Sequence, residues 1–335
     1  MNIIAPKDIS SEIEHLYQHG LPSGESMGWR DFDELMTMKL GTTFYLYGVP
    51  TSGKSEFWME VMVNTSCLYK WNHVIFSPET GRAKDITAEL ISKKFRKPFY
   101  QNIHGCITPA ELKEGIAWCN EHFRIFDQDY HGVDNIESFY RLVDECELGG
   151  FRVHTTVIDP WNEIKHDLAK FGGMRDLYLD DTLGLIRRNA DDNRRINCLI
   201  THIQGQETIS KDGHRYSPPP TAREIAWGEA WYRKGMNMMG FWRPPAGMTS
   251  DDGTPYQENE LYVLIHKYKP KGIGKKGQQV FYYDFKTNSY LIKTKPYGSK
   301  LESIRTRPSE NQSAGNEAIL RPNAEHSPAV ERPPF

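Results

Sequence analysis

The stretch Gly48-Val49-Pro50-Thr51-Ser52-Gly53-Lys54-Ser55 decides the fold of this chain. It fits the pattern G-x-x-x-x-G-K-[ST], in which a glycine-rich loop cradles the phosphates of a nucleotide. Residues 43–47 before it form an apolar, aromatic-rich run typical of a strand, and Phe57, Val61 and Leu68 after it follow a helical spacing. The pattern therefore predicts a phosphate site between a strand end and a helix N-terminus, where backbone N–H groups and the helix dipole favour anions.

The loop contains most of the predicted nucleotide ligands. Lys54 is expected to reach the β- and γ-phosphates of ATP, and the Ser55 hydroxyl is expected to ligate Mg²⁺. The other loop positions expected to contact the nucleotide are Gly48, Pro50, Thr51, Ser52 and Gly53. A glycine-rich turn without a ligand is the alternative, and the flanking strand and helix favour the nucleotide site.

Composition limits the class of protein. The 335 residues carry a net charge of −3, with 25% charged and 38% hydrophobic residues, which is ordinary for a soluble globular protein. No apolar run approaches the ~20 residues that span a bilayer, and the first residues lack a signal-peptide pattern. We therefore expect a cytoplasmic location, the host cytoplasm for a viral protein, and no membrane partner. The five scattered cysteines favour reduced thiols over a metal site or disulfides.

The chain is expected to have three parts. Residues 1–20 contain a short amphipathic helix near 8–17, expected either to bind a partner surface or to fold back on its own domain. Residues 21–294 alternate strands and helices, which predicts an α/β fold with a doubly wound, mostly parallel sheet and helices on both faces. Residues 295–335 have few large apolar side chains, which predicts a disordered tail.

Several elements of the middle part are predicted individually. Helical spacing marks residues 84–96, 108–122, 135–148 and 176–195. Apolar strands are expected at 73–79, 154–159 and 197–202. Two β-rich runs, near 261–267 and 280–285, are joined by a Gly/Lys loop and predict a closing antiparallel hairpin at one sheet edge.

Acidic residues end two of these strands. Asp159 is expected to face the crevice at the strand ends, where ligands of open α/β sheets bind, and to organise Mg²⁺ opposite Ser55. Its alternative is an N-cap of the segment 161–164. Glu79, expected on a strand that neighbours the loop, is the best-placed acid to orient and deprotonate the water that attacks the γ-phosphate. Its alternative is a solvated carboxylate.

A polar residue follows a third strand. His202 is suited to contact the γ-phosphate and to report hydrolysis to the loop beyond it, with Gln204 as a competitor for that role. The alternative is a structural histidine at a strand end.

The segment after His202 is a candidate nucleic-acid contact. The long, Gly/Pro-rich loop 205–222, with Lys211 and Arg215, has a length typical of functional or disordered loops. It leads into a short predicted helix whose N–H groups suit a phosphate chain, with Arg223 adding charge. Trp227 is suited either to base stacking or to the core.

Two lysines, Lys267 and Lys269, flank Tyr268 at the end of a predicted strand. Residues i and i+2 of a strand share a face, so the two ammonium groups are suited to reach a neighbouring subunit's γ-phosphate. A solvated basic edge that blocks aggregation is the alternative, and the residues alone favour it.

Taken in order, these motifs resemble the RecA-like motor domain of replicative hexameric helicases, the DnaB class, and particularly its Twinkle and phage primase-helicase branch. The likeness runs from about Gly20 to Leu291. It includes the segments 48–56, 76–79, 158–164, 201–202, 224–228 and 267–269. Several motifs in the right order are a more specific signal than the phosphate loop alone.

The resemblance implies a role for each candidate residue. Lys54 and Ser55 would bind ATP and Mg²⁺, Glu79 would be the catalytic base, Asp159 the Mg²⁺-organising acid and His202 the γ-phosphate sensor. Residues 205–229 would line a ring's central channel; the implied DNA contacts are Lys211, Arg215, Arg223, Ala226, Trp227 and Gly228.

The remaining implied roles concern subunit contacts and the base. Lys267 and Lys269 would act as fingers on the neighbouring subunit's ATP, and Tyr283 would stack on the adenine. The helix near 8–17 would pack on the adjacent subunit.

The sequence departs from the family pattern in three places. Lys269 stands where the family usually has Arg, which presents a rigid fork where Lys presents only a point charge. Glu224-Ile225-Ala226-Trp227-Gly228 stands where the Twinkle-like pattern prefers Asp-Ile-Ser-Gly-Ser. We also expect no primase domain before the motor, so a primase, polymerase or single-strand-binding protein would be a separate partner, as in a compact phage-like system.

The resemblance implies a homo-oligomeric, hexameric ring that hydrolyses ATP between subunits, translocates on single-stranded DNA and unwinds duplex 5′→3′. One alternative is a RecA/RadA-like recombination ATPase, which should carry a filament-linking motif that residues 1–20 do not show. Another is a KaiC-like or defence-associated regulatory ATPase that acts on protein. A ring without turnover is disfavoured by Glu79 together with Asp159.

Overall fold

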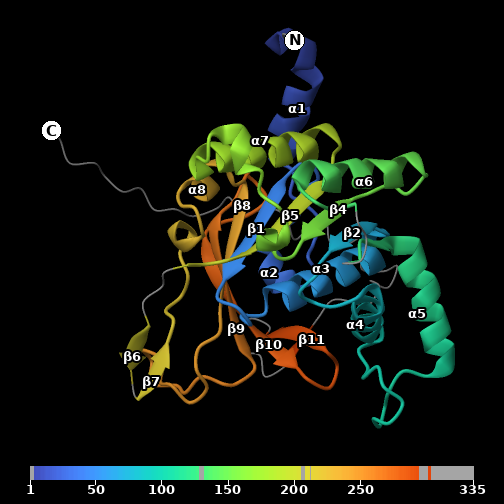
Figure 1. Ribbon diagram of the computed structural model, residues 1–335, viewed down its shortest axis with the longest axis vertical. Coiled ribbons are helices and arrows are strands. Elements are labelled where there is room, and N and C mark those ends of the chain that lie inside the picture. Colours follow the sequence, from blue (N-terminus) through green and yellow to red (C-terminus); the bar gives the residue numbers. More distant parts are fainter. Residues whose placement is uncertain (1–3, 128–131, 205–207, 212, 294–300, 303–335) are drawn as a thin grey trace.

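A ten-stranded sheet runs through the computed structural model, which describes residues 4–127, 132–204, 208–211, 213–293 and 301–302 (Figure 1). The strand order is β12-β11-β10-β9-β8-β1-β5-β4-β2-β3. The strands from β8 to β3 are parallel: β1 (Thr43–Gly48), β2 (His73–Phe76), β3 (Phe123–Ile125), β4 (Thr155–Ile158), β5 (Ile196–His202) and β8 (Asn237–Trp242). This confirms the predicted doubly wound, mostly parallel sheet.

The rest of the sheet is antiparallel. It consists of β9 (Glu260–Lys267), β10 (Gly277–Asp284), β11 (Ser289–Lys293) and β12 (Leu301–Glu302). The predicted closing hairpin is present as β9 and β10, and β11 and β12 extend the sheet beyond it. Residues 303–335 and most of 294–302, the segment predicted to be a disordered tail, lie outside the described residues.

Helices cover both faces of the sheet, as predicted (Figure 1). One face packs against α3 (Lys54–Tyr69), α4 (Ala83–Phe95) and α5 (Pro109–His122), and the other against α6 (Ile136–Leu148), α7 (Arg175–Asp192) and α8 (Ala230–Lys234). The alternation of β1 explains this arrangement: Phe44 and Leu46 belong to the first core, and Tyr45 and Tyr47 to the second.

Local sequence signals set the ends of two helices. The Thr108 hydroxyl accepts a hydrogen bond from the Glu111 backbone N–H at 3.2 Å, and Pro109 occupies the first turn of α5. The Asn135 side chain caps α6 by accepting from the Ser138 backbone N–H at 2.9 Å. These caps satisfy backbone donors that the helices themselves leave unpaired.

The residues that lead into β1 belong to the core. Trp29, before α2 (Arg30–Asp33), is fully buried, and its indole Nε1 donates to the Tyr290 carbonyl at 2.8 Å. Its ring stacks on Phe57 of α3 with centroids 5.3 Å apart and meets Phe281 of β10 edge-on at 5.1 Å. Trp29 therefore joins the antiparallel strands to the helix that follows the phosphate loop.

The N-terminal helix projects from the rest of the molecule (Figure 1). Helix α1 (Ser10–His19), which follows the 3-10 turn η1 (Pro6–Ile9), has no buried residue. Ile13, Leu16 and Tyr17 on it are 48%, 42% and 90% exposed. The helix therefore does not fold back on its own domain, which was one of its two predicted arrangements.

Some elements were not predicted. The loop 205–222 contains a two-stranded ribbon of β6 (Ile209–Lys211) and β7 (His214–Tyr216), and residues 205–207 and 212 lie outside the described part. The helix expected after it is short, because residues 222–224 form the 3-10 turn η4 (Ala222–Glu224) and α8 begins only at Ala230. Two more 3-10 turns, η2 (Trp161–Glu163) and η3 (Leu168–Phe171), follow β4. None of the described helices is long and apolar enough to cross a membrane, and all five cysteines are free thiols.

Candidate nucleotide-binding site

The predicted phosphate loop turns directly from β1 into α3. Gly48 ends β1, and a Cβ placed there would lie 2.5 Å from the Phe241 carbonyl oxygen, so no larger residue fits. Gly53, with φ +91°, immediately precedes α3 in a left-handed conformation that glycine adopts readily. The chain thus exposes the N-terminus of a 16-residue helix at the end of a central strand.

Lys54 supplies a buried positive charge to the loop. Its Nζ donates to the carbonyl oxygens of Val49 at 2.8 Å and Gly48 at 3.2 Å, and to the Ser52 hydroxyl at 3.2 Å. The residue is only 4% exposed, and this burial lowers the pKa of its amine to about 8 against the opposing influence of Asp159 and Glu79. An ammonium held by neutral oxygens is suited to exchange them for phosphate oxygens.

Asp159 lies at the same edge of the sheet, directly after β4. The Ser77 hydroxyl donates to its Oδ2 at 3.1 Å, and the Ser55 hydroxyl is also hydrogen-bonded to the carboxyl group. Burial raises the pKa of Asp159, while these two hydroxyls and Lys54 oppose the shift. A hydroxyl beside a carboxylate is an oxygen donor set that fits Mg²⁺. The alternative role as a helix cap is wrong, because Pro160 occupies the cap of η2 and no side chain bonds there.

Glu79 and His202 lie side by side at this edge of the sheet. His202 Nε2 lies 3.5 Å from Glu79 Oε2, and the Glu79 side chain is 53% exposed. The expectation that β2 lies beside the strand of the loop was wrong, since β4 and β5 separate β2 from β1. Glu79 still reaches the site because the carboxyl ends of parallel strands meet at one edge.

His202 is also placed beside the segment that follows it. Its Nδ1 is buried and has no hydrogen-bond partner among the described residues. Two residues later, the Gln204 backbone N–H donates to the Glu224 carbonyl at 2.8 Å, and Ile203 pairs with Ile225. The end of β5 is therefore fixed to the segment 224–228.

Tyr283 of β10 lies behind the loop. Its hydroxyl donates to Glu56 Oε1, in the first turn of α3, at 3.0 Å and is hydrogen-bonded to Asn288. Its ring meets Tyr290 edge-on with centroids 5.1 Å apart. The structure thus ties Tyr283 to the helix after the loop, and adenine stacking stays a prediction.

Sequence reasoning missed Arg243, which follows β8 at the same edge. An Nη2 hydrogen bond of 3.2 Å joins it to the Tyr290 hydroxyl, and its Nε lies 3.4 Å from a Cβ built on Gly53. That Nε is buried without a hydrogen-bond partner in the described part of the chain. Recognising β8 as a strand would have indicated Arg243, because the residue after a parallel strand lies at the ligand edge.

The predicted DNA contacts lie on two separate elements. Lys211 on β6 forms a 3.1 Å ion pair with Asp251, and Arg215 lies on β7. Arg223 in η4 lies 3.3 Å from Glu229. Ala226, Trp227 and Gly228 form the turn that precedes α8.

Trp227 contacts its own chain. It has a φ of +72°, uncommon for a bulky residue, and meets His166 edge-on with centroids 4.7 Å apart. Arg175 lies over its ring at 5.7 Å. These contacts favour the core role among the two that the sequence left open, and base stacking stays a prediction.

Lys267 and Lys269 lie at the opposite edge of the sheet from the loop. Because β9 is antiparallel to β8, Lys267 is level with Met238 at the start of β8. The Lys267 ammonium donates to the carbonyls of Tyr232 and, at 3.3 Å, Arg233 at the end of α8. Lys269 comes after the end of β9, so the expected shared strand face does not apply to it. Its side chain is exposed, and its backbone N–H donates to the Asn237 side chain at 3.0 Å.

Sheet order, phosphate loop and crevice define a RecA-like P-loop ATPase fold. Comparison with curated proteins finds 29% identity over 175 residues to the Twinkle homolog protein, chloroplastic/mitochondrial, of Arabidopsis thaliana. The match covers 50% of this chain and 24% of that protein, so it spans only about a quarter of the relative's length. No protein-family model matches the chain.

Solved structures share the fold. A solved ATPase domain superposes with a TM-score of 0.68 at 13% identity, covering 86% of this chain and 99% of that domain. A DnaB-like replicative helicase, solved in a study of its interactions with primase, gives a TM-score of 0.64 at 14% identity over 87% of this chain and 67% of the other. These likenesses confirm the predicted resemblance to the ATPase domains of DnaB-class replicative helicases.

Proposed function

We propose that this chain is the ATP-driven motor of a ring-forming DNA helicase that translocates on single-stranded DNA. The observation that carries the proposal is the meeting of Lys54, Ser55, Asp159, Glu79 and His202 in one crevice at the carboxyl edge of the sheet. The likeness to the Twinkle homolog and to DnaB-like folds supports the helicase assignment.

Each residue of the crevice has a defined chemical task in ATP hydrolysis. Lys54 and the loop N–H groups bind and orient the phosphates. Ser55 and Asp159 would hold Mg²⁺, which neutralises phosphate charge when bound. Glu79, more than half exposed, orients a water molecule and accepts its proton. His202 lies beside Glu79 and is fixed to the segment 224–228, so a change at the γ-phosphate position reaches that segment through β5.

The lysines at the amino edge support hydrolysis between subunits. Lys267 and Lys269 lie at the far edge of the sheet from the loop of their own chain. In a head-to-tail ring, each subunit presents a different edge to each neighbour, so these cations would reach the phosphates bound by the next subunit. Lys269 is exposed and is the better candidate, because Lys267 is already bonded to carbonyls of α8.

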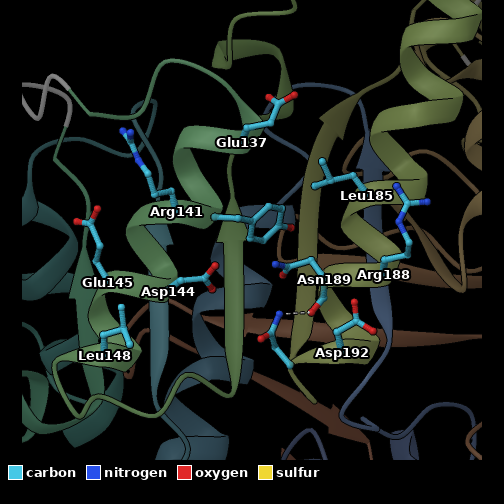
Figure 2. Close-up of a pocket in the computed structure, with 11 residues that line it drawn as sticks. Glu137, Arg141, Asp144, Glu145, Leu148, Leu185, Arg188, Asn189 and Asp192 are labelled. Atoms are coloured by element: carbon cyan, nitrogen blue, oxygen red, sulfur yellow. Dashed lines mark hydrogen bonds between the residues drawn. The ribbon is translucent and has the colours of Figure 1, made fainter. Parts of the chain in front are cut away.

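Helix α1 and a surface groove supply a route to ring assembly. The groove, about 760 Å³, lies between α6 and α7 (Figure 2). Leu148 of α6 and Leu185 of α7 give it apolar surface, and the charged residues Glu137, Asp144 and Arg188 also line it (Figure 2). Leu148 is 88% exposed and α1 has no buried residue, so each of the two surfaces lacks a cover within the described part of its own chain. We assign α1 of a second copy to this groove.

A mutation test of assembly follows from these contacts. Leu16→Asp on α1 or Leu148→Asp in the groove should shift the protein from ring to monomer in sedimentation velocity. Tyr100→Asp, which changes an aromatic residue that is 67% exposed elsewhere, is the matched control. Rings that persist in both variants would exclude this groove as the site of α1.

The remaining features of the proposal concern the substrate and partners. The segment 205–229 would face single-stranded DNA in the channel, with movement 5′→3′ and a hexameric ring. A separate primase, polymerase or single-strand-binding protein would complete the machinery.

Steady-state ATP hydrolysis with and without single-stranded DNA, at two salt concentrations, tests the function. Strong stimulation that fades with salt and vanishes in Lys54→Ala is expected, because phosphate contacts release counterions. Hydrolysis that is indifferent to DNA would exclude the helicase and favour a regulatory ATPase that acts on protein. DNA-stimulated hydrolysis on filaments, without unwinding, would favour a recombination ATPase.

A further inference from the structure

A partly buried hydrogen bond joins the strand of the phosphate loop to β9, the strand that ends at Lys267. The Tyr47 hydroxyl is hydrogen-bonded to His266 Nδ1, and their ring centroids are 5.8 Å apart. Tyr47 is fully buried and immediately precedes Gly48 of the loop. His266 immediately precedes Lys267. The two residues are 219 positions apart in the sequence, so only the fold brings them together.

The backbone is shaped to allow this contact. Strand β8 lies between β1 and β9, and Tyr47 is level with Gly240 of β8. Met238 pairs with Lys267 but Met239 pairs with Ile265, so His266 is the extra residue of a β-bulge. A bulge re-aims a side chain, and here it turns the His266 ring toward Tyr47.

Gly240 leaves room for the bond. A Cβ built on Gly240 would lie 3.0 Å from His266 Cε1 and 3.3 Å from Pro220 Cγ, tighter than most real contacts. Pro220 belongs to the segment that returns from the β6–β7 ribbon, which is part of the region proposed to contact DNA. Gly240 therefore lies between the His266 ring and Pro220, and the hydrogen bond from Tyr47 to His266 passes beside the segment that returns from the ribbon.

The electrostatics hold the pair in one arrangement. Burial and Lys276 lower the pKa of His266 while Glu224 opposes them, so the imidazole is neutral near pH 7. Burial raises the pKa of Tyr47, with Glu224 and Tyr232 adding to the shift, so its hydroxyl keeps its proton and is able to donate it to Nδ1 of the neutral ring. Because Tyr47 is fully buried, its hydroxyl would be left unpaired without His266, and the bond therefore fixes the position of both side chains.

We propose that His266 is a positioning residue, which together with Tyr47 fixes the end of β9 relative to the phosphate loop of the same subunit. This inference rests on the proposed function. In a ring, each subunit would contribute its phosphate loop to one nucleotide site and Lys267 and Lys269 to the next site. The Tyr47–His266 bond joins the phosphate loop to the end of β9. It thereby holds Lys269 in the position from which it supports ATP hydrolysis at the neighbouring subunit's site.

The test uses Tyr47→Phe, His266→Leu and His266→Gln in the full chain. The phenylalanine variant removes one oxygen and keeps the ring, so folding is preserved and is checked by thermal unfolding. We expect kcat for DNA-stimulated ATP hydrolysis to fall roughly tenfold in Tyr47→Phe and His266→Leu, since coupling residues contribute effects of this order. The affinity for ADP should stay within about twofold, because the loop itself is unchanged.

Three controls separate positioning from general damage. His266→Gln should recover most of the activity, since its amide can accept the same hydrogen bond. The double variant should be no worse than the worse single one, because both remove the same bond. Tyr45→Phe removes a hydroxyl from the same strand and face and should leave kcat unchanged; its ring packs against Trp231.

Each contrary result has a definite meaning. Unchanged kcat in both single variants, a loss of ADP affinity that matches the loss of kcat, or additive losses in the double variant would each overturn the positioning role. Lys269→Ala distinguishes this from a failure of the proposed function. If Lys269→Ala leaves kcat unchanged, the finger role itself is wrong; if it lowers kcat while Tyr47→Phe does not, only the present inference fails.

Discussion

The two edges of the parallel sheet differ in how complete they are. At the carboxyl edge, the charges of Lys54 and Asp159 act on each other's pKa, and Ser77 and Ser55 bond to the buried carboxyl group of Asp159. At the amino edge, Lys267 bonds to backbone carbonyls of α8, and Lys269 extends into solvent. One edge contains a set of groups that can bind a nucleotide; the other contains cations without an anion to bind among the described residues.

This difference teaches that one edge carries a full set of candidate nucleotide ligands, and the other only a fragment: two lysines that we propose complete the site of a neighbouring subunit. A buried cluster of opposite charges is stable only when its members satisfy one another, which the carboxyl edge achieves within one chain. An exposed lysine gains little from its own surface. In the proposed ring, this fragment would meet phosphate only when a second copy brings its carboxyl edge to it.

The largest expected effect concerns the complete edge. Glu79→Gln keeps the shape of the side chain and removes the proton acceptor, so kcat for ATP hydrolysis should fall about 10²–10³-fold. ADP affinity should change little, because Lys54 and the loop are intact. Glu163→Gln, at an exposed acid in η2, is the matched control. Hydrolysis at the normal rate in Glu79→Gln would mean that another group is the catalytic base. The carboxyl edge would then not be the complete site that the comparison of the two edges assumes.

The next effect concerns the fragment. Lys269→Ala should lower kcat by about ten- to a hundredfold while each subunit still binds ADP, because the missing charge belongs to the neighbour's site. Lys269→Arg should hydrolyse ATP at the natural rate or faster, since a guanidinium can donate two hydrogen bonds to one phosphate. Lys275→Ala removes an exposed charge from the β9–β10 loop and should leave kcat unchanged. A loss of ADP affinity in Lys269→Ala monomers would show that the lysine serves its own subunit.

The same contrast governs what the sequence could predict. The carboxyl edge was predictable because each residue follows an apolar run or belongs to a local motif, and parallel strands bring such ends together. The RecA-like sheet and its helices followed from periodicity. Strand β8 was missed because Asn237 and Gly240 are weak strand formers, although the strand is buried between β1 and β9.

Missing β8 had further consequences. Without it, neither Arg243 beside the loop nor the position of Lys267 at the far edge follows from the sequence. The order of β2 and β4 in the sheet could not be predicted either. Both are apolar strands followed by an acid, so the sequence does not tell which of them lies nearer to β1. Contacts such as Tyr47 with His266 depend on a bulge of one residue, which no periodicity reveals.

A pH measurement sharpens the description of the complete edge. The pKa of the Lys54 amine is lowered to about 8, so the amine is charged below that pH and neutral above it. Phosphate binds the charged form, so ADP affinity should be flat from pH 7 to 8 and fall about tenfold per unit above it. Isothermal titration calorimetry between pH 7 and 9.5 measures this. An affinity that stays constant to pH 9.5 would mean that Lys54 keeps an ordinary pKa.

The smallest expected effect lies on the β6–β7 ribbon, which leaves the carboxyl edge after β5. Lys211 and Arg215 lie on its two strands, but Lys211 is paired with Asp251 at 3.1 Å, and no ion pair of Arg215 with a described residue is found. A cation that already has a counter-charge contributes less to phosphate binding, because that pair must break first.

Arg215→Ala should therefore weaken single-stranded DNA binding a few-fold and reduce the slope of log affinity against log salt by about 0.7. Lys211→Ala should change both less, as measured by fluorescence anisotropy at several salt concentrations. Equal effects would mean that the Asp251 pair opens when DNA binds, and no effect in either variant would place the DNA contact on the segment 223–228 instead.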